Sequence, residues 1–154
     1  MSSIINGVVI EKLLMHEDDR GILIEGYRSD INPGYVPAMF YGSFTYVKKM
    51  RGPHEHKKQT DYFVFLGPGT VNFYLWDNRP KSSTYELKIK LTAGINRPYK
   101  IIVPPGVVHG YVATSEVPVL CLNFPDKLYG GIGGKEKVDE IRHEESAYSK
   151  FTFW

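Results

Sequence analysis

Apolar positions along this chain come in short runs, and few windows show the 3.6-residue period of a helix. The runs are bounded by Gly, Pro, Asn or Asp, residues that end strands and form turns. Short apolar runs at this spacing predict an all-β sandwich or barrel with little helix. The predicted strands are Val8–Leu14, Gly21–Tyr27, Met39–Val47, Tyr62–Leu66, Gly69–Trp76, Thr84–Leu91, Tyr99–Val103, Val108–Ala113 and Val117–Phe124.

Two segments differ from the other short apolar runs. The run Val71–Trp76 is almost continuously apolar, which predicts a strand covered on both faces, with a second subunit as the expected cover. The chain is therefore expected to form a homodimer. The segment Lys135–Glu145 has the composition of a helix, but the glycine pairs at 130–131 and 133–134 favour a loop equally.

Composition limits the classes of protein that fit. With 154 residues, 42% hydrophobic and 23% charged, the chain is expected to fold as one compact domain, residues 1–154. A net charge of +2, with basic residues scattered, argues against nucleic acid as a partner. No apolar run approaches the length of a membrane span, and no leader pattern opens the chain. A single cysteine, Cys121, excludes a disulfide framework, so we expect a cytoplasmic protein with no membrane partner.

Two histidine motifs carry the candidate chemistry. In Gly52-Pro-His54-Glu-His56, histidines two residues apart on a strand project to the same face. A second motif, Pro104-Pro-Gly106-Val-Val-His109, places a histidine just after a proline-glycine turn. Converging imidazoles can ligate a metal ion or act as general acids and bases.

Together with Asp61 and Gly67, these motifs resemble the paired motifs of the cupin superfamily, whose fold is a small jelly-roll β-barrel. The resemblance implies that the histidines meet inside the barrel. In many cupins they bind a divalent metal, and the matching positions here are His54, His56, Asp61 and His109. Asp61 stands where a glutamate is usual, and the second motif lacks its closing asparagine.

Further segments narrow the resemblance. They are similar to the dTDP-4-dehydrorhamnose 3,5-epimerase family, and they read Asp18-Asp-Arg20-Gly…Glu25, Arg51-Gly-Pro-His54, Trp76-Asp-Asn-Arg79 and Val103-Pro-Pro-Gly-Val-Val-His109-Gly-Tyr. That family implies a cofactor-free isomerase whose partner is a nucleotide-linked 4-keto-6-deoxy sugar, used in surface polysaccharide or lipopolysaccharide synthesis.

The resemblance also implies roles for single residues. Epimerisation beside a ketone needs a base, an electropositive group for the enolate oxygen and an acid across the ring. At matching positions, His54 is the expected base and Tyr129 the expected acid. The expected substrate-binding residues are Arg20, Glu25, Arg51, His56, His109 and Tyr41.

The chain departs from the epimerase pattern at two points. Asp61 occupies the position of a lysine that stabilises the enolate, and an acid there is expected to disfavour it. The segment that carries the aspartate partner of the histidine is expected to be absent, because the chain ends at Trp154. The partner of His54 is therefore unassigned.

Three alternatives remain open on the sequence. The pair His54 and His56, with Tyr41 upstream, also resembles the dTDP-4-keto-6-deoxyglucose 3,4-ketoisomerases. A cupin enzyme that uses Fe, Mn, Ni or Zn at His54, His56, Asp61 and His109 is a second alternative. A protein that binds a sugar nucleotide without catalysis is the third.

Overall fold

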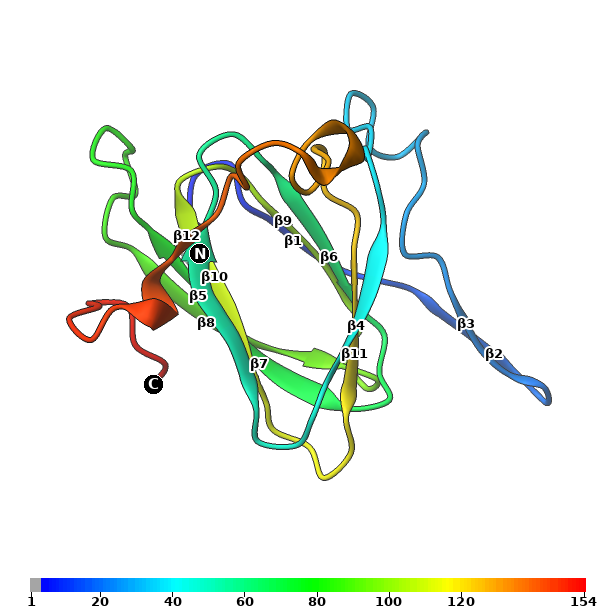
Figure 1. Ribbon diagram of the computed structural model, residues 1–154. Helices are drawn as coiled ribbons and strands as arrows, with labels where there is room; N and C mark the ends of the chain where they lie inside the picture. The colour runs from blue at the N-terminus through cyan, green and yellow to red at the C-terminus, as the bar shows by residue number, and fades with distance from the viewer. Residues whose placement is uncertain (1–3) are drawn as a thin grey trace.

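A computed structural model describes residues 4–154 and contains two antiparallel five-stranded sheets packed face to face (Figure 1). This arrangement confirms the predicted all-β class, and helix within residues 4–154 is limited to the single 3₁₀ turns η1 (Ile132–Gly134) and η2 (His143–Glu145). The strands are β1 Val9–Lys12, β2 Met15–Asp18, β3 Gly21–Ile24, β4 Tyr41–Thr45, β5 Met50–Glu55, β6 Asp61–Phe65, β7 Thr70–Asp77, β8 Lys88–Gly94, β9 Tyr99–Val103, β10 Val107–Ala113, β11 Val119–Asn123 and β12 Ile141–Arg142.

The two five-stranded sheets together form the barrel. One sheet runs β1-β9-β6-β11-β4 and the other β12-β5-β10-β7-β8. The hairpin β2-β3 belongs to neither sheet and projects away from the barrel as an arm (Figure 1). After β11 the chain passes over one end of the barrel before β12 adds to the edge of β5 (Figure 1).

The core lies between the facing sheets. Alternate residues of a strand point to one face, and Phe63 and Phe65 of β6 meet Phe73 and Leu75 of β7 there, all 5% exposed or less. The three phenylalanine rings pack at centroid distances of 5.4 to 6.2 Å. Burial of this apolar surface is the main force that holds the two sheets together.

The outward face of β7 is covered differently from the prediction of a second subunit. Tyr74 and Trp76 point outward, and the chain's own C-terminal segment covers them with Phe151 and Phe153. The Tyr74 hydroxyl donates a hydrogen bond to the carbonyl of Trp154 at 2.7 Å. The apolar run therefore reflects an intramolecular contact, and it no longer argues for a second subunit.

The predicted strand Thr84–Leu91 begins too early, because β8 starts at Lys88. The buried carboxylate of Asp77 draws the preceding residues into a turn, accepting bonds from the hydroxyls of Ser82 and Thr84, both at 2.6 Å. Arg79 closes the same turn, with Nε 2.7 Å from Asp77 Oδ1. Side-chain bonds of this kind compete with strand pairing.

Other boundaries also differ from the prediction. The short exposed strand β2 was not expected, since all four of its residues are exposed and carry no apolar alternation. The strands β5 and β12 were also missing from the predicted set. For 135–145 the loop alternative is confirmed, because only one 3₁₀ turn forms at its end.

No helix within residues 4–154 is long and apolar enough to cross a membrane.

Candidate active site

A pocket of about 380 Å³ is lined by the histidines of both motifs and by part of the C-terminal segment. Its walls come from β4, β5, β10 and the segment around β12. Cavities of this size are typical of small-molecule sites. The titratable side chains on its walls are Tyr41, Arg51, His54, His56, His109, Tyr111, Cys121, Tyr129, Glu140, Arg142 and Glu144.

The pairing of β5 with β10 brings His54 and His109 together. His54 on β5 lies directly opposite His109 on β10, and their ring centroids are 4.5 Å apart. A bulge at Gly52 sets this alignment, because the register shifts by one residue between His54 and Arg51. Gly52 has φ 75°, and a Cβ there would lie 2.6 Å from the carbonyl oxygen of His109. Only glycine fits this position.

His56 follows the end of β5 and faces the same pocket, with its ring centroid 5.7 Å from that of His54. Its Nδ1 contacts the backbone carbonyl of Asp139. The Asp139 carboxylate in turn accepts backbone N–H bonds at 57–59, at 2.7 to 3.2 Å. The C-terminal segment therefore holds the orientation of His56.

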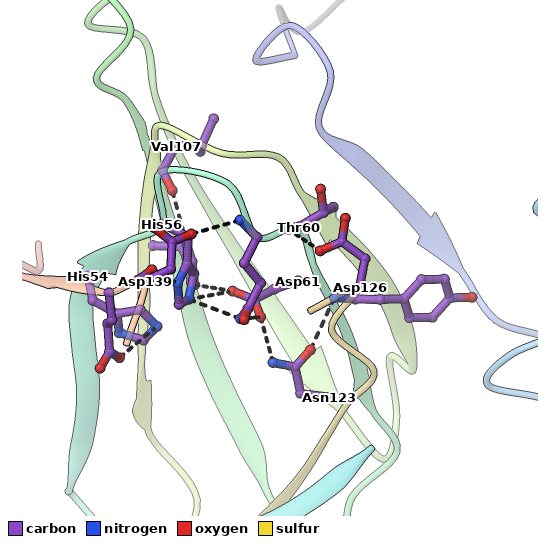
Figure 2. A network of polar contacts seen from close by, with 12 residues as sticks. His54, His56, Thr60, Asp61, Val107, Asn123, Asp126 and Asp139 are labelled. Atoms are coloured by element: carbon purple, nitrogen blue, oxygen red, sulfur yellow. Dashed lines mark hydrogen bonds and ion pairs between the residues drawn. The ribbon is translucent and has the colours of Figure 1, made fainter. Parts of the chain in front are cut away.

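Asp61 is buried between the histidines and Asn123 (Figure 2). Its Oδ2 is 3.2 Å from Nε2 of His56 and 3.2 Å from Nε2 of His109. Its Oδ1 accepts hydrogen bonds from the side-chain amides of Gln59 and Asn123, at 2.9 and 2.8 Å. The side chain is 1% exposed and does not line the pocket, so it serves as a counterion to the histidines rather than facing an enolate.

The surroundings of His54 and His56 shift the pKa values of the two side chains in opposite directions. Burial, reinforced by the His109 imidazole, holds the pKa of His54 well below its ordinary value, so His54 is neutral at pH 7. For His56, burial opposes the charge, but the Asp61 carboxylate outweighs it and raises the pKa. Burial also opposes ionisation of Asp61, yet hydrogen bonds from His109 and His56 keep its pKa well below the usual range. A neutral base thus lies beside a histidine whose charged form is favoured by a buried carboxylate.

Glu140 is a pocket residue that the sequence did not reveal. Its Oε1 lies 3.9 Å from His54 Nε2, and its Oε2 accepts a bond from Arg142 Nε at 2.7 Å. The pairing of β12 with β5 places it there, because Arg142 is opposite His54 in the ladder. A carboxylate therefore lies beside His54, whose partner the sequence left unassigned. The only signal was an acid-rich segment, in which no spacing singles out one carboxylate.

The remaining expected site residues fall into two groups. Tyr41, Arg51 and Tyr129 line the same pocket as the histidines. The Tyr41 hydroxyl accepts a bond from Asn123 at 2.9 Å, and Arg51 donates to Thr45 Oγ1 at 3.0 Å. Tyr129 is 56% exposed at the pocket rim.

The arm residues are not brought to the pocket of their own chain. Arg20 lies at the tip of the β2-β3 hairpin and pairs with Asp18 at 2.5 Å. Glu25 follows β3 and pairs with Arg28 at 3.2 Å. Neither side chain lines the pocket that holds His54.

Comparison with known proteins adds independent findings. Residues 2–130 match the family model for dTDP-4-dehydrorhamnose 3,5-epimerase. The chain is 32% identical over 125 residues to the spore coat polysaccharide biosynthesis protein SpsL of Bacillus subtilis strain 168, covering 81% of this chain and 82% of that protein. It is also 32% identical over 127 residues to the probable low-salt glycan biosynthesis epimerase Agl13 of Haloferax volcanii, covering 81% of each.

The fold has a close match among solved structures. The dTDP sugar isomerase of Desulfovibrio desulfuricans G20 superimposes with a TM-score of 0.83 at 22% identity, covering 96% of this chain and 91% of that one. This likeness confirms the cupin-type fold. The family match and the identity to the two relatives extend over most of the chain. The chain therefore belongs to the dTDP-4-dehydrorhamnose 3,5-epimerase family.

Proposed function

We propose that this protein epimerises a nucleotide-linked 4-keto-6-deoxy sugar by proton abstraction and return. The observation that carries the proposal is a partly buried, neutral His54 with Glu140 beside it and Tyr129 at the rim of the same pocket. A base, its orienting carboxylate and an acid are the groups that the reaction requires.

In this mechanism His54 removes the proton from a carbon next to the ketone. The electrons of the C–H bond move to the carbonyl oxygen, which becomes an enolate, and Tyr129 returns a proton from the opposite face. His56, whose pKa the Asp61 carboxylate raises, is the group that can supply the positive charge for which the sequence predicted no source. The family acts without a cofactor, and side chains carry each of these steps.

Glu140 is the positioning residue for His54. At 3.9 Å the carboxylate is beyond hydrogen-bond distance, but such contacts tighten when substrate closes the site. A carboxylate behind an imidazole selects its tautomer and stabilises the imidazolium that forms on proton uptake. Arg142 holds this carboxylate in place through Oε2.

The names of the two relatives support a role in making surface glycans. We infer that the substrate sugar enters such a polymer after epimerisation. A cytoplasmic location fits a chain with one buried cysteine and no possible disulfide within it.

Deuterium exchange tests the proposed reaction. Incubation with a dTDP-4-keto-6-deoxy sugar in heavy water is expected to place deuterium at C3 and C5, read by NMR. Deuterium confined to C3 or C4 with movement of the keto group would indicate a 3,4-ketoisomerase instead. A complex that forms without any exchange would indicate a binding protein.

We also propose a homodimer in which the arm of one subunit reaches the pocket of the other. Neither Arg20 nor Glu25 lines the pocket of its own chain, and both would contact a substrate in the pocket of a second copy. The arm exposes apolar side chains that favour a protein contact, with Leu23 60% and Ile22 45% exposed.

Mixing inactive variants tests this dimer. Arg20→Ala and His54→Ala should each be inactive alone, while random pairing restores roughly a quarter of wild-type exchange, because one of two sites in each heterodimer is intact. A mixture of His54→Ala with Glu140→Gln is the matched control. It should show only the residual activity of its Glu140→Gln chains, with no gain on mixing, since both changes alter the pocket formed by the main barrel. No recovery in the first mixture, or a monomer by light scattering, would refute the shared site.

A further inference from the structure

Glu55 is a buried carboxylate that the proposed reaction does not use. It follows His54 on β5, and because side chains alternate along a strand, it is directed away from the pocket that His54 lines. Glu55 is only 7% exposed. Burial of a carboxylate is costly unless hydrogen bonds compensate for the lost water, so the partners of Glu55 indicate its role.

The partners of Glu55 lie on two other parts of the chain. Its Oε1 accepts a hydrogen bond from Asn78 Nδ2 at 2.9 Å and lies 2.9 Å from His143 Nε2. A carboxylate only accepts hydrogen bonds, so His143 Nε2 is the donor. The other side of the contact is apolar, because the His143 ring packs against Phe151 with the ring centroids 4.5 Å apart. Glu55 therefore holds His143 against the barrel.

Asp139 holds the chain at a point four residues before His143. Its carboxylate accepts backbone N–H bonds at 57–59, at 2.7 to 3.2 Å, and its carbonyl oxygen contacts Nδ1 of His56 (Figure 2). We call residues 139–143 the strap. Glu140 thus lies on a short segment that is attached to the barrel at both ends.

The strap has little backbone pairing of its own. The strand β12 has two residues, with Ile141 opposite Glu55 and Arg142 opposite His54. So few backbone hydrogen bonds do not offset the conformational entropy lost when the segment is ordered. The side-chain contacts at the two ends must therefore hold the strap in place, and with it the distance of 3.9 Å between Glu140 Oε1 and His54 Nε2.

We propose that Glu55 is a positioning residue for the catalytic base and acts through His143 and the strap. By binding His143 it keeps β12 paired with β5, so that the Glu140 carboxylate faces His54. Glu55 itself does not line the pocket and does not contact the substrate. The catalytic part rests on the proposed function, whereas the attachment of the strap does not.

The attachment is tested first, without substrate, by amide hydrogen exchange followed by mass spectrometry. Glu55→Ala and His143→Ala should each speed exchange in peptides that cover the strap by at least about tenfold, because its local opening becomes easier. Glu55→Gln keeps the acceptor oxygen and should protect the strap as the wild type does. Glu116→Gln, which changes an exposed acid far along the chain from the strap, is the control and should have no effect.

Two observations separate attachment from misfolding. Peptides of β6 and β9 should exchange equally slowly in all variants, and melting curves should show each variant folded at the assay temperature. If Glu55→Ala does not fold, His143→Ala removes the same link while leaving Glu55 bonded to Asn78. Strap exchange as slow or as fast in the folded alanine variants as in the wild type would overturn the proposal.

The catalytic part is tested with deuterium exchange into the keto sugar. Glu55→Ala and His143→Ala should lower kcat by roughly 10- to 100-fold, as expected when an orienting group moves by about 1 Å. KM should stay within about twofold of the wild-type value, because neither residue lines the pocket. Glu55→Gln should retain most of the wild-type kcat.

A double-mutant comparison identifies the route. When Glu140 is already replaced by Gln, adding Glu55→Ala should lower kcat no more than about twofold further, since the carboxylate through which Glu55 acts is gone. An undiminished further loss would overturn action through Glu140, and so would equal losses in Glu55→Gln and Glu55→Ala. If the wild type places no deuterium in the sugar, the epimerase proposal fails, and amide exchange alone decides whether Glu55 holds the strap.

Discussion

Replacement of His54 by alanine is expected to abolish deuterium exchange into the keto sugar, with a loss of about 10³-fold or more. His54 is the partly buried, neutral imidazole of the pocket, so its removal leaves no base at the reacting carbon. Substrate binding should change far less, because His54 is only one of the many side chains that line the pocket. The check is the initial rate of exchange at C3 and C5 by NMR, with binding measured separately by calorimetry.

Cys121→Ser is the control in the same pocket. Burial raises the pKa of the Cys121 thiol to about 12, so at neutral pH it cannot act as a base, and its replacement should leave exchange intact. Glu140→Gln should fall between the two, with a lower kcat and little change in KM, as expected of a residue that only orients His54. Equal exchange rates in His54→Ala and the wild type would overturn the assignment of the base.

Asp77→Asn is expected to lower the free energy of unfolding by about 3 kcal/mol at pH 7, because it leaves the Arg79 guanidinium without its counterion and breaks bonds to a buried carboxylate. The Asp77 side chain is fully buried and accepts bonds from Arg79, Ser82 and Thr84. These bonds hold the turn that precedes β8. Urea unfolding followed by tryptophan fluorescence measures the loss.

The pH dependence of this loss follows from the pKa of Asp77. Burial acts to raise that pKa, but the hydrogen bonds from Arg79, Ser82 and Thr84 outweigh it and hold the pKa well below its ordinary value. The stabilisation is therefore complete above the unfolded-state pKa of about 3.9 and is lost as the pH falls through the folded-state value. The difference between wild type and variant should be smaller at pH 3 than at pH 7.

Glu116→Gln is the matched control for Asp77→Asn. Glu116 is an exposed acid on the loop between β10 and β11, so its replacement should change stability by no more than about 0.5 kcal/mol at either pH. An Asp77→Asn loss as small as that of the control would contradict the role assigned to the buried carboxylate.

Much of the barrel could be predicted because its strands bury one face. Alternating apolar residues such as Phe63 and Phe65 mark strands in any context where one side faces a core. The strand Tyr99–Val103 was predicted at its observed bounds. The apolar pattern did not predict β2, because every residue of that strand is exposed. It also did not predict the start of β8, because hydrogen bonds to the Asp77 side chain hold the preceding residues in a turn.

The histidines of the site could also be predicted, since His54 and His56 share one motif and His109 ends a second motif. Their convergence is a local consequence of strand pairing, with His54 opposite His109. Glu140 could not be predicted, because a loop of unrestricted path carries it to His54 and no residue spacing records that path. The role of Asp61 was misjudged for the same kind of reason. The sequence shows an acid where a lysine was expected, but not which side chains surround it.

The sequence by itself determined the all-β class, the three histidines of the pocket and the family, because these depend on periodicity and on short motifs whose geometry is local. The tertiary structure alone decided that the C-terminal segment covers Trp76, that Glu140 meets His54, and that Asp61 lies under two imidazoles. Each of these contacts joins residues distant along the chain or separated by a loop. Contacts of this kind depend on how the sheets pack and close, which no local pattern encodes.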